Sequence, residues 1–249
     1  KLKAIWQCVL VIKRTTNLQN KLPINEYFPT IQGEATYTGQ PAFFIRLQQC
    51  PVGCGFCDTK YTWHLNKKDE VDDLKIIENK KNLKWETGEG NSKYIYLSNT
   101  EILGMVSVSR IKHVVFTGGE PCMYDLRPIT NLLHKYKYKT QIETSGTFEI
   151  KASDDTWVTV SPKIGNTIKG NKTVLGSSYR RANEIKYPVG KMQDILNLQK
   201  IIVDYDIKDK EIWLQPLSTS EKATDLCVQM AMTHNWRISI QTHKYINVR

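Results

Sequence analysis

The sequence predicts an α/β fold in which a parallel sheet is either open or closed into a barrel. Short runs rich in β-branched and aromatic residues recur along the chain, and helical patterns lie between several of them. Strands that alternate with helices are typical of a parallel sheet. The predicted strands span residues 42–47, 113–117, 140–144, 157–161, 183–187, 211–215 and 237–241.

Two segments between the predicted strands have apolar residues at the helical spacing i, i+3, i+4 and i+7. These residues are Ile129, Leu132, Leu133 and Tyr136 in the first segment, and Ala223, Leu226, Cys227 and Met230 in the second. Ser218, followed three residues later by Glu221, matches the capping-box pattern. The pattern predicts that the second helix begins there.

The N-terminus and one polar stretch fit this alternation least well. Residues 1–21 match no clear element, and they are predicted to be an N-terminal extension of a core domain over residues 22–249. Residues 63–99 are rich in Lys, Glu and Asn, which predicts a peripheral insertion. The most apolar early stretch, residues 6–12, is too short to cross a membrane.

Composition bounds the class of protein. The chain has 249 residues, of which 40% are hydrophobic, enough for a sizeable core in one domain of barrel size or two small ones. Its formal net charge of +10 would suit nucleic acid, an anionic small molecule or a solvated surface. The lysines are scattered and interleaved with acidic residues, which argues against nucleic acid. Because no signal-peptide cleavage site follows the early apolar stretch, we expect a cytoplasmic protein.

Polar residues follow nearly every predicted strand. In parallel α/β folds the carboxyl ends of the strands form the active-site face. Turns and helix caps use the same residue types, so one such cluster would carry little weight. A series of five predicts a functional face, and its members are residues 117–120, 143–146, 161–163, 215–218 and 241–244.

Three of the six cysteines, Cys50, Cys54 and Cys57, crowd into one short segment. A disulfide framework would spread its cysteines more evenly, so the C-x3-C-x2-C spacing indicates a metal site. Soft thiolates on one loop suit an iron–sulfur centre, and three ligands to a four-iron cluster leave one iron open to a small molecule. Zinc and chance clustering are the alternatives. Structural zinc usually has four ligands, and His64 is the only nearby candidate for the fourth.

The cysteine spacing, with Phe56 before the last cysteine, resembles the signature of the radical S-adenosylmethionine (SAM) superfamily. Gly118, Gly119 and Glu120 follow a predicted strand and resemble that superfamily's Gly-Gly-Glu motif, whose backbone and carboxylate hold the amino group of SAM. The resemblance implies that the open iron of a 4Fe-4S cluster binds SAM. One-electron reduction then cleaves SAM to a 5′-deoxyadenosyl radical.

Longer motifs resemble a narrower family, the 7-carboxy-7-deazaguanine synthases. They are PINEYFPTIQGE from Pro23, GQPAFFIRL from Gly39, CDT from Cys57, QIETSGT from Gln141, WVTVSPK from Trp157, LQP from Leu214 and QTHKY from Gln241. This resemblance, which covers about residues 22–248, implies a carbon–nitrogen lyase. Such an enzyme contracts 6-carboxy-5,6,7,8-tetrahydropterin to 7-carboxy-7-deazaguanine with loss of ammonia, on the route to queuosine and other 7-deazapurines.

The resemblance also implies a compact, incomplete TIM-like barrel, bound magnesium, a homodimer and a flavodoxin or ferredoxin as electron donor. SAM would act catalytically, since the radical takes a hydrogen from the pterin and later returns it. Magnesium maps onto Thr59, whose hydroxyl is a suitable hard ligand. The SAM contacts map onto Phe56, Cys57, Asp58, Gly118, Gly119, Glu120, Ser161, Pro162, Lys163, Gln215, Pro216, Leu217 and Ser218.

The pterin contacts map onto a second group of residues. They are Ile31, Gln32, Gly33, Glu34, Arg46 and Thr117, with Glu143, His243 and Lys244 as further candidates at strand ends. Gln32 can pair with the amide edge of a flat pterin, and Glu34 with its exocyclic amine. The guanidinium fork of Arg46 suits the substrate carboxylate, although an ordinary ion pair at a strand end is the alternative.

Two features depart from the family pattern. One is the N-terminal extension. The other is Ala35, where the family usually has glycine. If position 35 needs a positive φ, alanine would strain the substrate loop.

Two other functions remain as alternatives at this point. Another radical SAM enzyme, such as one that activates a protein glycine, would need the cysteines and Gly-Gly-Glu but neither residues 32–34 nor Thr59. A basic binding module with a structural metal would turn over no SAM. A second role through protein contacts of residues 63–99 is compatible with an enzyme.

Overall fold

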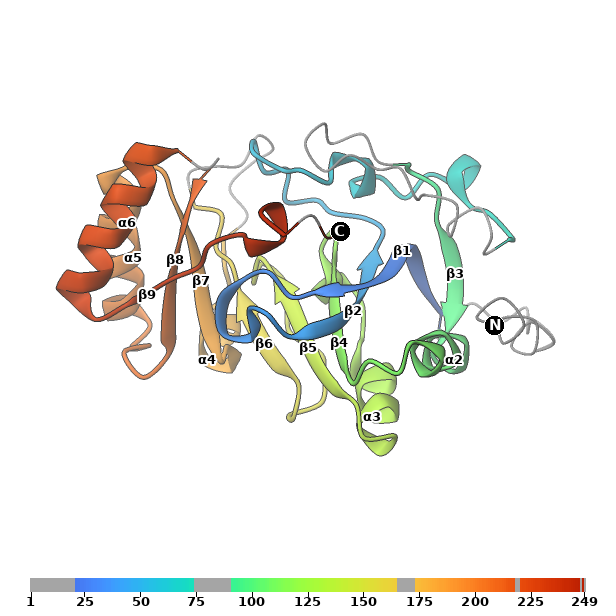
Figure 1. Cartoon of the computed structure of the whole chain (residues 1–249). Coiled ribbons are helices and arrows are strands. Elements are labelled where there is room, and N and C mark those ends of the chain that lie inside the picture. The colour runs from blue at the N-terminus through green and yellow to red at the C-terminus, as the bar shows by residue number, and fades with distance from the viewer. Residues whose placement is uncertain (1–20, 74–90, 165–172, 218–219, 247, 249) are drawn as a thin grey trace.

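The computed structural model describes residues 21–73, 91–164, 173–217, 220–246 and 248. Within these ranges, one nine-stranded sheet has the order β3-β1-β2-β4-β5-β6-β7-β8-β9 (Figure 1). The strands are β1 (Lys21–Ile31), β2 (Pro41–Leu47), β3 (Ile95–Ser98), β4 (His113–Gly118), β5 (Lys139–Thr144), β6 (Trp157–Val160), β7 (Glu184–Val189), β8 (Glu211–Pro216) and β9 (Arg237–Ile238). From β2 to β9 neighbouring strands are parallel, whereas β1 is antiparallel to β2 and β3.

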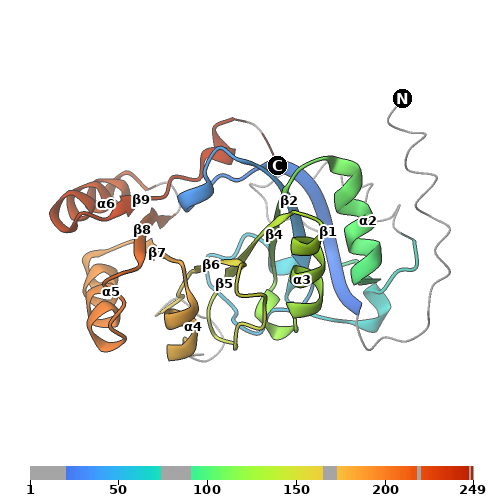
Figure 2. The same cartoon turned by 90° about the horizontal axis from the view of Figure 1, so that it is seen from below.

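Helices line the outer side of the curved sheet (Figure 2). They are α2 (Asn99–Ser109), α3 (Arg127–Lys135), α4 (Gly176–Arg181), α5 (Met192–Asp204) and α6 (Glu221–His234). The core lies in two clusters, one around β1, β2, β4 and β5 with α2 and α3, the other around β6 to β8 with α4 to α6. No α-helix among the described residues has both the length and the apolar character of a membrane span.

The sheet curves without closing, because β3 and β9 are its two edges. Residues 32–40, between β1 and β2, reach across the inner side to the far strands. The Ala35 amide donates to Ser239 Oγ at 3.0 Å, and Thr36 Oγ1 donates to Glu184 Oε2 at 2.5 Å. These bonds tie the two ends of the sheet together, and the predicted incomplete TIM-like barrel is confirmed.

Six of the predicted strands match observed strands to within two residues at either end. The seventh, residues 237–241, is wrong in length, since β9 contains only Arg237–Ile238. Beyond it the chain turns inward, where Ser239 accepts the bond from Ala35. The first predicted helix also needs a correction. Tyr136 is 53% exposed at the end of α3, and the buried residue at the other end of this face is Leu126.

The predicted capping box at Ser218 is wrong. The N-cap of α6 is Ser220, whose Oγ accepts from the Ala223 amide at 3.4 Å, while Ser218 lies outside the described residues. A capping box does occur at α2. Ser98 Oγ accepts from the Glu101 amide at 3.3 Å, and the Glu101 carboxylate accepts from the Ser98 amide at 2.7 Å.

Residues 63–99 are not peripheral throughout. Leu97, on β3, is buried and lies opposite Leu22 of β1. The buried Asn25 side chain donates to the carbonyl oxygens of Asn91 at 3.0 Å and Lys93 at 3.1 Å. The final part of the stretch therefore belongs to the sheet. The sequence does not predict β3, because this strand has only four residues and its neighbours in the chain are polar. Residues 74–90, and all of the predicted extension except Lys21, lie outside the described residues.

Ala35 adopts a left-handed backbone, with φ of +54°, and is 1% exposed. This conformation costs a residue with a Cβ about 1–2 kcal/mol. In Ala35→Gly, relief of that strain should roughly cancel the lost methyl burial, about 0.8 kcal/mol, and the added unfolded-state entropy, about 0.4–1 kcal/mol. We therefore expect the free energy of unfolding to change by less than about 0.5 kcal/mol.

Ala42 is the matched control for this prediction, because it is equally buried and lies on β2 without a positive φ. Ala42→Gly should lose about 1.2–1.8 kcal/mol, since no strain relief offsets its losses. Urea unfolding of the two variants would measure the difference. Equal losses would show that Ala35 is not strained.

Candidate active site

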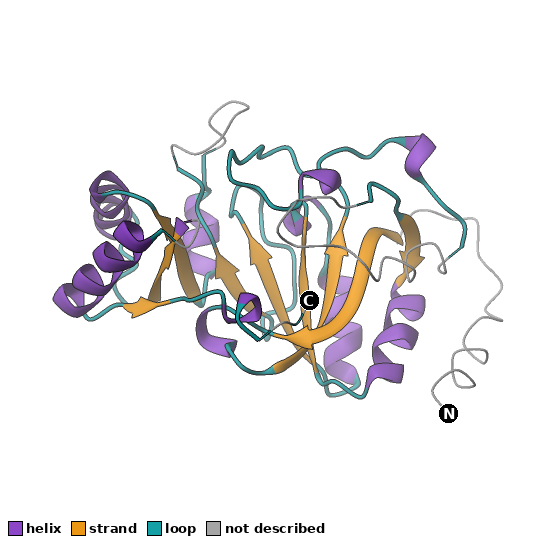
Figure 3. Cartoon of the chain, turned by 45° about the horizontal axis from the view of Figure 1, so that its top comes forward, coloured by secondary structure: helices purple, strands orange, loops and turns teal. Residues whose placement is uncertain are grey.

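A cavity of about 350 Å³ is lined by residues at the carboxyl ends of the parallel strands. The loops that follow these strands gather on the same side of the sheet (Figure 3). Each of the five polar clusters at strand ends contributes residues to the cavity. Among the described residues, every predicted site residue except Pro162 lines this cavity. Ser218 lies outside the described residues. Positions up to about 200 residues apart in the chain therefore meet in one place.

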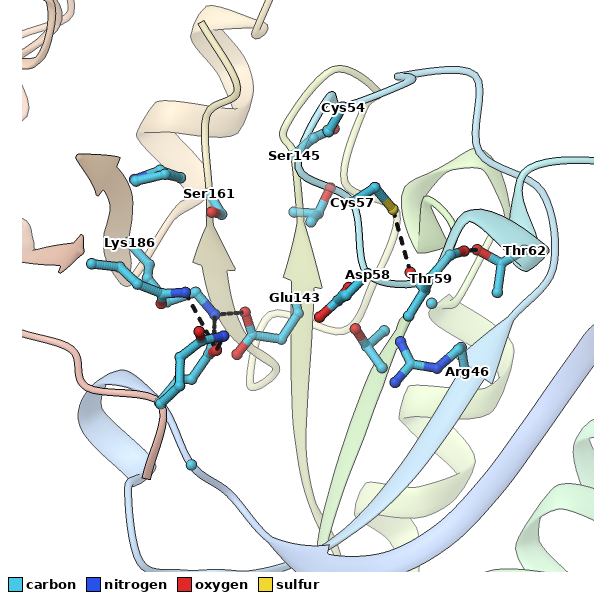
Figure 4. A pocket seen from close by; sticks show the side chains of 18 of the residues that line it. Arg46, Cys54, Cys57, Asp58, Thr59, Thr62, Glu143, Ser145, Ser161 and Lys186 are labelled. Carbon is cyan, nitrogen blue, oxygen red and sulfur yellow. Dashed lines mark hydrogen bonds and ion pairs between the residues drawn. The ribbon is translucent and has the colours of Figure 1, made fainter. Parts of the chain in front are cut away.

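The three cysteines lie on the loop that follows β2 and line the cavity. Figure 4 shows Cys54 and Cys57 at one side of it. The Cys50 amide donates to the carbonyl oxygen of Trp63 at 3.1 Å, and the Cys57 amide donates to that of Cys54 at 3.2 Å. Gly53 has a φ of +65°, which lets the loop turn back on itself. The backbone thus brings all three thiols to the same cavity.

The chemistry of these thiols fits an iron–sulfur cluster. Burial raises the pKa of Cys50 to about 12 and also raises the pKa of Cys54. Buried thiols of this kind ionise when a metal supplies the compensating charge. Within the described part of the chain, no three His, Cys, Asp or Glu side chains could hold a single metal ion. A four-iron cluster binds its three cysteines through different irons, so the loop suits a cluster better than zinc.

Gly118 and Gly119 bring the end of β4 against the start of the cysteine loop. The Gly119 amide donates to Leu47 O at 2.9 Å, and the Glu120 amide donates to Gln49 O at 2.8 Å. A Cβ at Gly119 would lie 2.1 Å from Gln49 O, and Gly118 has a φ of +131°. Only glycine fits both positions, so this motif and the cysteine motif are packed as one unit.

The Glu120 carboxylate is fully engaged by the protein. It accepts hydrogen bonds from the Cys122 amide at 3.0 Å, from Thr144 Oγ1 at 2.5 Å, and from both the amide and the hydroxyl of Ser145. Four bonds saturate the acceptor sites of a carboxylate. The predicted contact of this carboxylate with SAM does not fit that arrangement. We infer that Glu120 positions the Gly-Gly backbone against β5 instead.

Opposite the cysteine loop, Lys186 forms an ion pair with Glu143 (Figure 4). It forms a second ion pair with Glu34. Its Nζ lies 2.6 Å from Glu143 Oε2, and its side chain is only 7% exposed. Lys186 comes from the middle of β7, Glu143 from the end of β5, and Glu34 from the segment after β1. Lys186 is not among the predicted site residues, because it lies within a predicted strand rather than at its end.

The two carboxyl groups of this wall titrate differently. Burial would raise the pKa of Glu34, but Lys186, with the Gln241 hydrogen bond and the His243 charge, outweighs it and lowers that pKa to about 2. For Glu143, burial prevails over Lys186 and the Glu34 charge adds to it, so the pKa rises to about 7. The two carboxylates outweigh burial at Lys186 and raise its pKa. Near neutral pH, Glu143 is therefore the group in this wall that exchanges a proton.

Amide side chains complete this wall. Gln32 Nε2 donates to Glu143 Oε1 at 3.3 Å, while Gln32 Oε1 accepts from the Glu34 amide at 3.2 Å. Gln241 Nε2 donates to Glu34 Oε1 at 2.7 Å. Gln241 belongs to a predicted cluster, but only the resulting fold shows that its side chain reaches Glu34.

Arg46 is held by a partner that is missing from the predicted site. Its Nε donates to Glu26 Oε1 at 2.6 Å, and both side chains are buried. The register of β1 and β2 places these two residues opposite each other. Thr59, the predicted magnesium ligand, is also buried, and its Oγ1 lies 3.6 Å from Cys57 Sγ. Glu26 could be found only once β1 was known to pair with β2.

Near the cysteine loop, Lys163 Nζ donates to Ser161 Oγ at 2.6 Å and lies 5.6 Å from the centre of the Phe56 ring. Burial lowers the pKa of Lys163. On the other side of the cavity, Gly33 packs against His243, whose pKa is also lowered by burial. A Cβ at Gly33 would lie 2.2 Å from His243 Nδ1, which explains the glycine in the Gln-Gly-Glu segment.

Comparison with known proteins agrees with this geometry. Residues 44–209 match the model of the radical SAM superfamily. The chain is 48% identical over 232 residues to the 7-carboxy-7-deazaguanine synthase of Buchnera aphidicola, covering 91% of this chain and 99% of that protein. It is 46% identical to the enzyme of that name from Escherichia coli K12, with coverage of 91% and 98%.

A solved structure agrees as well. The crystal structure of QueE from Escherichia coli superposes with a TM-score of 0.82 at 45% sequence identity, covering 90% of this chain and 95% of that one. These matches cover nearly the whole length of both chains. The chain therefore belongs to the radical SAM superfamily and, within it, to the 7-carboxy-7-deazaguanine synthase family.

Proposed function

We propose that the cavity binds SAM beside the cysteine loop and 6-carboxy-5,6,7,8-tetrahydropterin between that loop and the Lys186 wall. The chain is a radical SAM lyase that contracts the pterin ring to 7-carboxy-7-deazaguanine in 7-deazapurine biosynthesis. The atoms balance with the loss of one ammonia and no net oxidation. The observation that supports the assignment of the site is that one cavity joins three cysteines to a wall of buried amide, carboxylate and guanidinium groups.

Cys50, Cys54 and Cys57 would hold a 4Fe-4S cluster, which would supply the one-electron chemistry for the cleavage of SAM when both are bound. The chain's own residues bind and orient. We assign the backbone of Gly118 and Gly119 to the methionine end of SAM. Ser161 and Lys163 at the end of β6, and residues 215–217 at the end of β8, line the rest of that side of the cavity.

On the substrate side, Gln32 and Glu34 present the pattern that a pterin edge requires. The side-chain carbonyl of Gln32 and the carboxylate of Glu34 can accept from the exocyclic amine and ring N–H groups. Lys186 and Gln241 hold the Glu34 carboxylate in place. The bonds to these partners keep the wall organised before the substrate arrives.

The substrate carboxylate is assigned to Arg46. Glu26 accepts a hydrogen bond from the guanidinium Nε of Arg46. This bond fixes the orientation of the planar guanidinium group, and Arg46 lines the cavity. We assign magnesium to Thr59, beside that fork, where the ion would screen the carboxylate and orient it. Omitting magnesium from the reaction should then lower turnover.

The reaction itself tests this proposal. The protein is reconstituted anaerobically with iron and sulfide, reduced, and incubated with SAM, magnesium and carboxytetrahydropterin. We expect mass spectrometry to find 7-carboxy-7-deazaguanine in excess over the SAM consumed, because SAM is regenerated. SAM cleavage without this product would overturn the substrate. An iron-free protein without SAM cleavage would overturn the cofactor as well.

The oligomeric state and the reductant are part of the same proposal. We assign a homodimer, which sedimentation of the reconstituted protein would show as twice the 28.7 kDa chain mass. For the reductant we assign a flavodoxin or ferredoxin. A formal charge of +10 favours an acidic partner of this kind, and docking that depends on it should weaken as salt is raised.

A further inference from the structure

Trp63 contacts the cysteine loop at both ends. Its carbonyl oxygen accepts from the Cys50 amide at 3.1 Å, and its indole Nε1–H donates to Cys57 Sγ at 3.4 Å. The side chain lines the same cavity as the thiols. One residue outside the cysteine motif therefore bonds to the first and the last of the three cysteines.

A buried frame holds Trp63 in this position. Its own amide donates to Lys60 O at 3.1 Å, which closes a single helical turn. The Gln48 side chain, which is fully buried, donates to the carbonyl oxygens on either side of Trp63, to Tyr61 at 3.1 Å and to His64 at 2.7 Å. The backbone that carries the indole is thus held in place by the fold on both sides of Trp63.

A hydrogen bond to a cluster thiolate acts on the reduction potential. Reduction adds negative charge that spreads onto the thiolate sulfurs, so an N–H donor stabilises the reduced cluster more than the oxidised one. Hydrogen bonds to the sulfurs and solvent exposure are two of the factors that set the potential of iron–sulfur clusters. Groups just outside the ligand set tune metal sites in the same way.

We propose that Trp63 raises the reduction potential of the cluster through its hydrogen bond to Cys57. The inference rests on the cluster assignment of the proposed function. Trp63 acts through a ligand and touches no reacting atom, so it is a positioning residue. The electron comes from the flavodoxin- or ferredoxin-type reductant, or from dithionite in vitro, and Trp63 favours its residence on the cluster.

Trp63→Phe tests the proposal, because it keeps a ring in the cavity and removes the donor. The readout is an anaerobic redox titration of the cluster followed by EPR. At a fixed applied potential we expect the ratio of reduced to oxidised cluster to fall about threefold to tenfold, a shift of about 30–60 mV to more negative potential for a one-electron couple. In deuterated buffer, the exchangeable hydrogen coupled to the reduced cluster of the unsubstituted protein should be missing from the variant in pulsed EPR.

Trp236→Phe is the matched control, since Trp236 stacks on His234 at 4.4 Å, packs against the second core cluster and does not line the cavity. It should leave the potential unchanged. An unchanged potential and an unchanged hydrogen coupling in Trp63→Phe would overturn the proposal. If that variant assembles no cluster, 3-benzothienylalanine at position 63, which keeps the ring shape and replaces N–H by sulfur, decides the question by the same titration. Absence of a reducible cluster in the unsubstituted protein would overturn the cluster assignment itself.

Discussion

Cys50→Ala is expected to abolish the formation of 7-carboxy-7-deazaguanine together with the EPR signal of a reducible cluster. The change removes one of the three thiolate ligands that the proposed cluster requires, all of which line the cavity. Loss of groups that merely support metal ligands costs about 10–100-fold, so loss of a ligand should exceed about 100-fold in turnover. Iron content, EPR and product formation would be measured on the same preparation.

Cys227→Ala is the control that separates cluster loss from misfolding. Cys227 is fully buried in α6, belongs to the second core cluster and does not line the cavity. Its truncation should lower the free energy of unfolding by about 1–2 kcal/mol and leave the cluster intact. Cys50 belongs to neither core cluster, so Cys50→Ala should leave the stability of the iron-free protein within about 0.5 kcal/mol. Full cluster loading of Cys50→Ala would contradict the assignment.

The active-site face could be predicted because its signal is local. A β-rich run followed by a polar cluster occupies fewer than ten residues, and parallel strands place such clusters at one edge. The same reasoning does not reach Lys186, which lines the cavity from within β7, or Glu26, which holds Arg46 from within β1. Which side chains these two residues meet depends on the pairing and register of the strands. Both are properties of the folded sheet and cannot be read from a local stretch of sequence.

The sequence does not predict β1, and the cause is equally specific. β1 contains Pro23 and Pro29, and proline within a run normally argues against a central strand. Both fit here in an antiparallel pairing that carries a bulge between Ile24 and Glu26.

The serine–glutamate capping pattern occurs twice with the same spacing, and only Ser98 caps a helix with it. The local sequence does not distinguish the two serine–glutamate pairs. Where each helix begins depends on the path of the chain after the preceding strand.

Lys186→Met is expected to cost about 3–5 kcal/mol of stability near pH 8, because it leaves Glu34 and Glu143 buried together without their cation. Turnover should fall by about 100-fold or more, since both carboxylates lose the partner that fixes their positions in the cavity wall. Lys200→Met is the matched control. Lys200 pairs with Asp204 at 2.9 Å but is 75% exposed, so its loss should cost less than about 0.5 kcal/mol. Urea unfolding and steady-state kinetics would measure both variants.

The pH dependence of stability distinguishes loss of this charge from simple loss of packing. In the unsubstituted protein, Glu34 has a folded pKa of about 2, so its stabilising contribution is present above 4.5 and is lost only as the pH falls towards 2. Glu143 has a folded pKa of about 7, so it holds a proton that the unfolded chain releases near 4.5. As the pH rises from 4.5 to about 7, this one group therefore lowers the free energy of unfolding by about 1.4 kcal/mol per pH unit.

Without Lys186, which lowers the pKa of both carboxyl groups, Glu34 should hold its proton as well as Glu143. Two retained protons double the contribution of this wall to the slope, to about 2.8 kcal/mol per pH unit between about pH 5 and pH 7. In the double variant Glu34→Gln/Lys186→Met, one of the two carboxyl groups is gone and the slope should return to that of the unsubstituted protein. Equal slopes in Lys186→Met and the unsubstituted protein would mean that Lys186 does not keep Glu34 ionised. The wall would then owe its charge state to Gln241 and the neighbouring amides, and the loss of stability to packing alone.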